Sequence, residues 1–128
     1  MKHFFSFLII LTFLGSCKSP KETLSPKETV EAYLAATNRF DSDAAKELLI
    51  LNKQNLMVLE TLKKMEKSIP ANRKAEFLNK EKNAVYTEKE ITQSTAVIIV
   101  SSQEIAMPFE FSLKKTNNIW LIQSIREL

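Results

Sequence analysis

The sequence predicts an α+β fold in which helices come first and strands follow. Between residues 26 and 78, apolar side chains recur every three or four positions, which is the period of an amphipathic helix. From Asn83 onward, apolar and polar residues tend to alternate, which is the period of a strand. Helices followed by consecutive strands with short turns predict three or four N-terminal helices packed on a curved antiparallel sheet of about four strands.

The first long helix has a clear start. Ser25, Pro26 and Glu28 form a capping box with proline at the first helical position, so the helix is expected to run from Pro26 to about Phe40. The same five letters, Ser-Pro-Lys-Glu-Thr, occur earlier at residues 19–23 without a long amphipathic pattern after them. We interpret residues 17–24 as a tether and residues 25–128 as one domain.

Two further helices follow in the pattern. Asp41 and Asp43 end the first helix and cap a second short one, because carboxylates are favourable at a helix N-terminus. A third helix is expected over residues 55–68, and Pro70 ends it or starts a short helix through residues 77–78. Its inner stripe is predicted to consist of Leu56, Leu59, Leu62, Met65 and Ile69.

The first two strands differ in their composition. Residues 85–91 carry several charges, which predicts an edge strand or a partly exposed face. Residues 95–101 are nearly all apolar, which predicts a central strand covered on at least one side.

A hairpin closes the chain. Residues 105–115 alternate, with Phe109 and Phe111 on the apolar face and Glu110 on the polar face. Asn117 and Asn118 are expected to make the turn, because asparagine tolerates positive φ. The last strand, residues 119–125, is predicted to place Trp120 and Ile122 on one face and Leu121 and Ile125 on the other.

The N-terminus predicts export. Lys2 and His3 precede an apolar run over residues 4–14, and the small residues Gly15 and Ser16 follow, as in a secretory signal of residues 1–16. The run is shorter than the about 20 residues of a membrane-crossing helix. Residues 14–17 (Leu-Gly-Ser-Cys) resemble the lipobox of bacterial lipoproteins. That resemblance implies that Cys17 becomes the first residue and carries acyl chains such as palmitate. The alternative is a plain signal whose cleavage leaves a free thiol.

Composition excludes many enzyme classes. His3 and Gly15 are the only histidine and glycine, and both belong to the signal. Without histidine there is no Ser-His-Asp or Cys-His pair and no HExxH zinc site. Without glycine there is no phosphate-binding Walker A loop and no GxGxxG turn. Cys17 is the only cysteine, so no internal disulfide forms.

Two stretches resemble a known superfamily. Residues 25–34 (SPKETVEAYL), leading to Asp41 and Ala45, are similar to the opening of nuclear-transport-factor-2-like (cystatin-like) domains in small bacterial lipoproteins of unknown function. Residues 113–122 (LKKTNNIWLI) resemble their final hairpin, although asparagines replace the usual turn glycine. The resemblance implies a domain that in some members has a cone-shaped pocket. Some relatives are isomerases, dehydratases or hydrolases, and others only bind or assemble.

The sequence supports a non-catalytic binding or interaction module on a membrane, not an enzyme, with no cofactor or metal. A ligand site, if open, is expected between the helices and the sheet, lined by Tyr33, Phe109, Phe111 and Trp120; the alternative is that these aromatics fill a closed core. A carboxylate-dependent enzyme of the same superfamily and an immunity or inhibitor lipoprotein are the other hypotheses. An acid dyad would need inward carboxylates, whereas Asp41 and Asp43 begin a helix and Glu104 and Glu110 are expected in a turn and on the polar face.

The expected partners follow from the anchor. Cys17 would hold the chain to a membrane, and either a protein or a small apolar ligand would bind the domain. Residues 63–82 carry seven basic side chains against three acidic ones, which indicates a solvated helix face or a patch for anionic lipid or polysaccharide. Nucleic acid is not expected.

The residue after Cys17 predicts the membrane. In enteric bacteria an aspartate at this position retains a lipoprotein in the inner membrane, whereas this chain has Lys18. The outer membrane facing the periplasm is therefore predicted where the host has one, with the cell surface as the alternative. The oligomeric state is left open.

Overall fold

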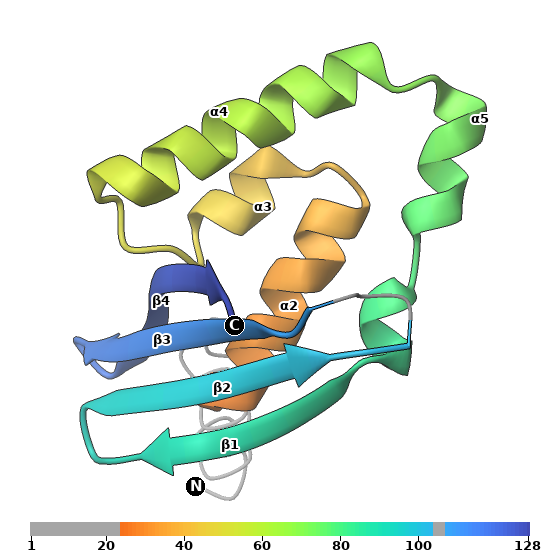
Figure 1. Cartoon of the computed structure of the whole chain (residues 1–128). Coiled ribbons are helices and arrows are strands. Elements are labelled where there is room, and N and C mark those ends of the chain that lie inside the picture. Colours follow the sequence, from red (N-terminus) through yellow and green to blue (C-terminus); the bar gives the residue numbers. More distant parts are fainter. Residues whose placement is uncertain (1–23, 104–106) are drawn as a thin grey trace, which may run out of the picture.

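The computed structural model describes residues 24–103 and 107–128. It confirms the α+β class, with helices followed by a four-stranded antiparallel sheet (Figure 1). The helical elements are α2 (Pro26–Asn38), α3 (Ser42–Lys46), α4 (Lys53–Ser68), α5 (Ala71–Lys74) and the 3₁₀ turns η2 (Ala75–Phe77) and η3 (Lys80–Asn83). The strands are β1 (Val85–Ile91), β2 (Thr95–Ser101), β3 (Phe109–Thr116) and β4 (Ile119–Glu127).

The start of α2 is the predicted capping box. The Glu28 amide donates to Ser25 Oγ at 3.1 Å, and the Ser25 amide donates to Glu28 Oε1 at 3.0 Å. The helix ends at Asn38, two residues earlier than expected, because Phe40 adopts the left-handed conformation with φ 59°. Asp41 then caps α3, its carboxylate accepting from the Ala44 amide at 3.0 Å.

Helix α4 begins at Lys53, after the N-cap Asn52, and its inner stripe differs from the prediction. The buried residues are Asn55, Leu59 and Leu62. Leu56 is 46% exposed, so its assignment to the inner stripe was wrong. Asn55 takes the inner position because its side-chain amide donates to three backbone carbonyls, those of Ile50, Ile122 and Gln123, at 2.8, 3.1 and 3.1 Å.

The strands follow each other in the order β1-β2-β3-β4, with β1 at an edge and β2 in the interior as predicted. Asn117 and Asn118 both have positive φ and make the predicted turn between β3 and β4. Strand β3 begins at Phe109, later than the predicted residue 105. Met107 lies in a bend before the strand and is 48% exposed.

An irregularity in β4 overturns one predicted face. Leu113 pairs with Ile122 and Ser112 with Ser124, so Gln123 is an extra residue in the last strand. Such a bulge resets the alternation of side chains. Ile125 therefore pairs with Phe111 and lies on the same inner face as Ile122, not on the opposite face with Leu121.

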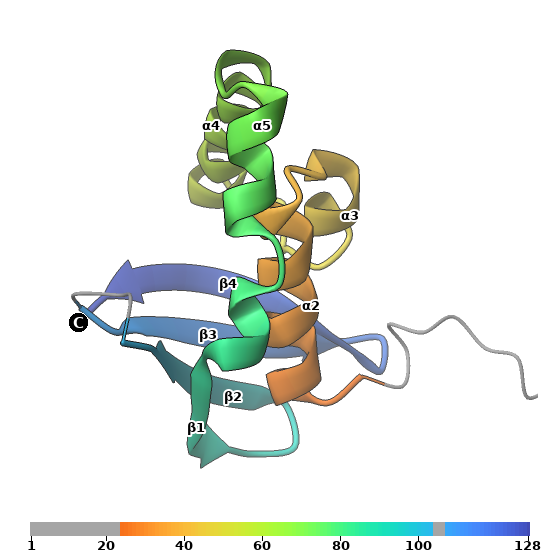
Figure 2. The same ribbon diagram turned by 90° about the vertical axis from the view of Figure 1, so that its right-hand side faces the viewer.

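The helices cover one face of the sheet. Figures 1 and 2 show α2 across that face, and α4 and α5 beyond the β4 edge, arching over towards the start of β1. The β4 edge is paired with the segment after α3: the Ile50 amide donates to the Ile122 carbonyl and the Ile122 amide to the Leu48 carbonyl, both at 2.9 Å. This pairing holds the first turn of α4 close to the sheet.

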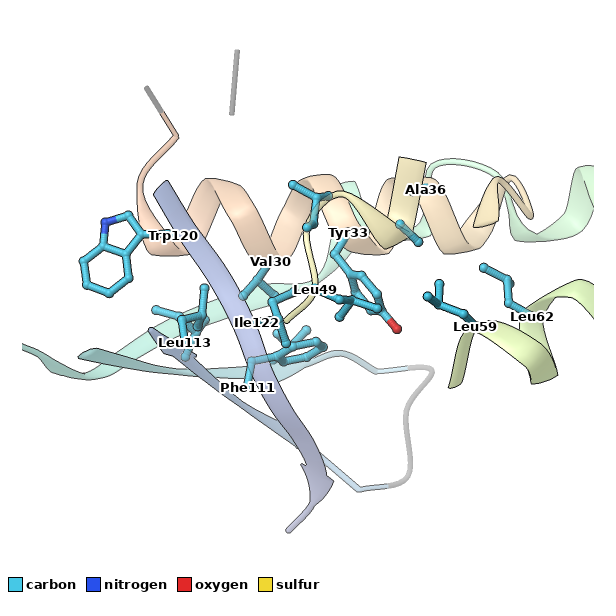
Figure 3. Close-up of a cluster of buried hydrophobic side chains, with 14 of the residues drawn as sticks. Val30, Tyr33, Ala36, Leu49, Leu59, Leu62, Phe111, Leu113, Trp120 and Ile122 are labelled. Atoms are coloured by element: carbon cyan, nitrogen blue, oxygen red, sulfur yellow. The ribbon is translucent and has the colours of Figure 1, made fainter. Parts of the chain in front are cut away.

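The tightest packing lies between α2 and the middle of the sheet. Its most deeply buried side chains are Val30, Ile98, Val100, Leu113 and Ile122, each at most 1% exposed (Figure 3). Burying each of these contributes about 1.5–3 kcal/mol.

Candidate functional site

An open cleft of about 600 Å³ lies between the C-terminal half of α2, helix α4, Phe77 and the inner face of the sheet. Its volume falls within the range of small-molecule sites. Most of the lining is apolar: Tyr33, Leu34, Val58, Leu62, Met65 and Phe77 from the helical side, and Phe109, Phe111 and Ile125 from the sheet.

Helix α4 lines the cleft along most of its length, from Gln54 to Met65. Every residue of α4 after Leu62 is exposed. Met57 and Met65 line the cleft and are 64% and 39% exposed. Methionine is unbranched and polarizable, so this wall can adapt to the shape of an apolar partner.

Tyr33 is the most unusual residue of the lining. Its side chain is 5% exposed and its ring meets that of Phe111 edge-on, with the centroids 6.0 Å apart. Burial raises the pKa of Tyr33 to about 12, so the hydroxyl keeps its proton at neutral pH. None of the hydrogen bonds among the described residues involves this hydroxyl, which points towards α4 beside Leu59 (Figure 3).

The other polar side chains of the lining differ from Tyr33. The Thr37 hydroxyl donates to the Leu34 carbonyl, and the Thr61 hydroxyl to the Met57 carbonyl, both at 3.0 Å. Asn38 Nδ2 donates to Glu81 Oε1 at 3.0 Å. Gln54 is exposed at the mouth, where water reaches it. Among the polar side chains that line the cleft, Tyr33 therefore combines a largely buried ring with a hydroxyl that has no acceptor among the described residues.

Two aromatic rings close one side of the cleft. Phe40 and Phe77 meet edge-on with their centroids 5.4 Å apart. Lys74 Nζ lies 5.9 Å from the centre of the Phe40 ring, and Lys80 Nζ lies 5.5 Å from that of Phe77. These cation–π contacts tie α5 and the start of η3 to the two rings.

The structure brings three of the four predicted lining residues together. Tyr33, Phe109 and Phe111 surround the cleft. Trp120 lies apart from it, on the inner face of β4, with its ring under Lys115 Nζ at 5.7 Å. Cys17, the predicted lipidation site, lies outside the described residues.

Sequence reasoning missed the α4 wall and Phe77. The sequence predicted a single buried stripe on α4 that included Met65. In the structure Met65 is 39% exposed and, with Met57 and Val58, forms a second apolar side that lines the cleft. The sequence does contain an indication of this second side. Residues 56–59 are all apolar, and four consecutive residues cannot lie on one narrow stripe of a helix.

Glu110 is the buried carboxylate that the sequence placed on a polar face. Its side chain is 7% exposed and accepts from Arg126 Nε at 2.6 Å and Lys89 Nζ at 3.2 Å. The hydrogen bond from Arg126 is the main cause that holds the pKa of Glu110 below its usual range, with Lys89 adding to it. A carboxylate held ionised by two cations is a structural ion cluster and a poor general acid. Glu104 lies outside the described residues.

Within the described parts of the chain, no group of three or more His, Cys, Asp or Glu residues is arranged to hold a metal ion. The helices over residues 24–103 and 107–128 include none with the length and apolarity that a membrane crossing requires. Comparison of the chain with protein-family models, with curated proteins and with solved structures finds no match in any of the three.

Proposed function

We propose that this chain is an exported lipoprotein, anchored through Cys17, whose domain acts as a non-catalytic module that binds a small apolar ligand in the cleft. The observation that carries the proposal is the cleft of about 600 Å³ with its mostly apolar lining. The order of helices and sheet also supports assigning the domain to the nuclear-transport-factor-2-like class.

The exposure of the lining supports a binding site over a closed core. Large apolar side chains that remain exposed together on one wall are costly in water and commonly mark an interaction site. Met57 and Met65 are such residues, and Phe109 and Ile125 opposite them are only half-buried. A ligand between these two walls would remove both from water.

The carboxylates that the sequence singled out support binding over catalysis. Asp41 is engaged in capping α3, and Glu110 is engaged by Arg126 and Lys89. Neither lines the cleft.

The anchor would leave the cleft accessible. Residues 18–24 span roughly 23 Å when extended, at about 3.3 Å per residue. The cleft lies along the C-terminal half of α2, whose 13 residues rise about 20 Å in total. A membrane attachment at the N-terminal end therefore places the cleft on the side of the domain away from the anchor. Where the host has an outer membrane, we place the protein there, facing the periplasm.

The binding proposal is tested by filling the cleft. Thr61→Trp adds an indole to the α4 wall, and Lys63→Trp adds the same group to an exposed α4 position outside the lining. The full chain, purified from its host, is analysed by native mass spectrometry for copurifying lipid-sized molecules. We expect such a molecule on the wild type and on Lys63→Trp, and its loss from Thr61→Trp. Identical bare masses for all three would contradict the proposal.

The anchor is tested separately. Cys17→Ala in the native host is expected to release the domain from the membrane fraction or to leave it unprocessed. Intact-mass analysis of the wild type should show acyl chains on Cys17. A variant that remains membrane-bound as before, together with a wild type without acyl chains, would show that the lipoprotein assignment is wrong. Protease added to whole cells distinguishes a periplasmic from a surface location.

A further inference from the structure

The polar group of the ligand can be inferred from a hydroxyl of the cleft lining that has no protein acceptor. We propose that the cleft binds an acyl compound, an apolar chain whose carbonyl oxygen accepts a hydrogen bond from the Tyr33 hydroxyl, and that Tyr33 is the specificity-determining residue. This inference rests on the proposed binding function and names the class of its ligand.

The first step is the state of the Tyr33 hydroxyl. The side chain is 5% exposed, yet the hydroxyl takes part in no hydrogen bond among the described residues. Among the described residues, Asn55 Oδ1 is the fully buried side-chain polar atom that lacks a partner, so the Tyr33 hydroxyl is not sealed from the open space of the cleft that its side chain lines. A ligand acceptor that enters the cleft can therefore take this hydrogen bond in place of water.

The second step is the direction of the hydroxyl. Phe111 packs edge-on against the Tyr33 ring, which fixes the ring plane, and the hydroxyl points away from α2 towards α4 (Figure 3). Leu62 of α4 lines the same cleft. A ligand atom between the sheet and α4 would therefore be in reach of this donor.

The third step is the kind of acceptor. Burial raises the pKa of Tyr33 to about 12, so at neutral pH the group donates and carries no charge. Most of the remaining lining is apolar, as at Val58, Leu62, Phe109 and Ile125. The Thr37 and Thr61 hydroxyls and the Asn38 amide already donate to protein acceptors, and Gln54 is exposed. One neutral donor among apolar walls matches a molecule with one carbonyl and an otherwise apolar body. A polyol or a sugar, with many polar groups to satisfy, does not match.

Two sources share this chemistry, a free fatty acid and the ester carbonyl of a lipid. The test uses a photoreactive dodecanoic acid with a diazirine near its chain end. The full chain is reconstituted in nanodiscs and irradiated, and peptides with adducts are mapped by mass spectrometry. Three competitors of the photoreactive acid are added: dodecanoic acid, methyl dodecanoate and dodecyl bromide. The bromide is the control, because it has the apolar chain but no carbonyl. Partition into the bilayer is the same for every variant, so it cancels when variants are compared.

Tyr33→Phe removes only the hydroxyl oxygen, and Tyr86→Phe is the matched control, because its hydroxyl donates to the Glu81 carbonyl outside the lining. For Tyr33→Phe we expect the half-inhibiting concentrations of the acid and the ester to rise at least threefold to tenfold, while that of the bromide stays the same. Tyr86→Phe should change none of them. Stronger competition by the acid than by the ester identifies a free fatty acid, and the reverse order identifies an ester lipid.

The outcomes separate this inference from the function it rests on. In one outcome, each of the three compounds suppresses the adducts on α4 or β3 to the same extent in wild type and in Tyr33→Phe. This result would support a binding cleft and overturn the role of Tyr33. A parallel weakening of all three compounds in Tyr33→Phe would also overturn it, since a lost hydrogen bond cannot weaken dodecyl bromide. The absence of adducts on any residue that lines the cleft would overturn the binding function itself.

Discussion

Helix α2 and strands β3 and β4 contribute to two regions that differ in their packing. In the closed core, around Val30, Leu113 and Ile122, the side chains are at most 1% exposed. In the cleft, around Tyr33, Phe109 and Ile125, the walls stand apart and enclose about 600 Å³. The difference arises in α4: Asn55 ties its first turn to β4 and the segment before it, whereas every residue after Leu62 is exposed. Helix α4 thus packs Leu59 and Leu62 into the core and leaves Met57 and Met65 exposed along the cleft.

The largest expected difference is between two isoleucines of β4. Ile122→Ala in the closed core should lower the free energy of unfolding by about 3–5 kcal/mol, because a fully buried side chain leaves a cavity. Ile125→Ala at the cleft should cost less, since this side chain is only partly buried. Urea denaturation measures both. Equal costs would show that the cleft is packed like a core in solution, and Ile122→Val, expected at about 1 kcal/mol, keeps the comparison measurable if Ile122→Ala does not fold.

The tie between α4 and β4 gives the second prediction. Asn55→Ala leaves the carbonyls of Ile50, Ile122 and Gln123 without their side-chain donor and should cost about 2–3 kcal/mol. Asn38→Ala, which removes an amide at the cleft that bonds only Glu81, should cost about 1 kcal/mol or less. Thermal denaturation of the pair measures the difference. A smaller loss of stability for Asn55→Ala than for Asn38→Ala would contradict the role of Asn55 in holding α4 against β4.

A smaller effect is expected from acid. Glu110 has its pKa lowered mainly by the hydrogen bond from Arg126, so its contribution to stability is present above its ordinary pKa of about 4.3 and is lost as the pH falls through the lowered value. Glu28 has its pKa lowered by the Ser25 backbone amide in the capping box, so its contribution follows the same direction. Glu110→Gln should flatten the decrease in unfolding free energy between pH 5 and about 2 more than Glu28→Gln, because Glu110 is bonded to two cations. An equally steep decrease in Glu110→Gln and wild type would exclude this role.

The smallest expected effect distinguishes the two tyrosines. Burial raises both pKa values to about 12, yet only the Tyr86 hydroxyl has an acceptor, the Glu81 carbonyl at 2.7 Å. Tyr86→Phe should therefore cost about 1 kcal/mol of unfolding free energy, and Tyr33→Phe about zero in the absence of ligand. Chemical denaturation with the cleft empty checks the pair. A cost of Tyr33→Phe as large as that of Tyr86→Phe would mean that the Tyr33 hydroxyl is already satisfied.

The features that could be predicted from sequence are those that a few neighbouring residues decide. The capping box of Ser25 and Glu28, the cap at Asp41 and the turn at Asn117 and Asn118 all formed as expected, because each depends on local backbone geometry. The change of hydrophobic period at Asn83 correctly divided helices from strands. Of the four aromatic residues named from the sequence, Tyr33, Phe109 and Phe111 line the cleft, since the inner faces of a helix and of a strand follow from their periods.

The features that the sequence did not predict depend on contacts between distant residues. The extra residue Gln123 turned Ile125 to the inner face, and only pairing with β3 places such a bulge. Asn55 displaced Leu56 from the inner stripe because carbonyls of β4, 67 residues away, accept from its amide. Whether the aromatics close into a core or leave a cleft likewise depends on where α4 lies relative to the sheet. Local periodicity thus determined the helices and strands of this chain, because each depends on neighbouring residues, and tertiary packing decided which apolar side chains remain open at the cleft.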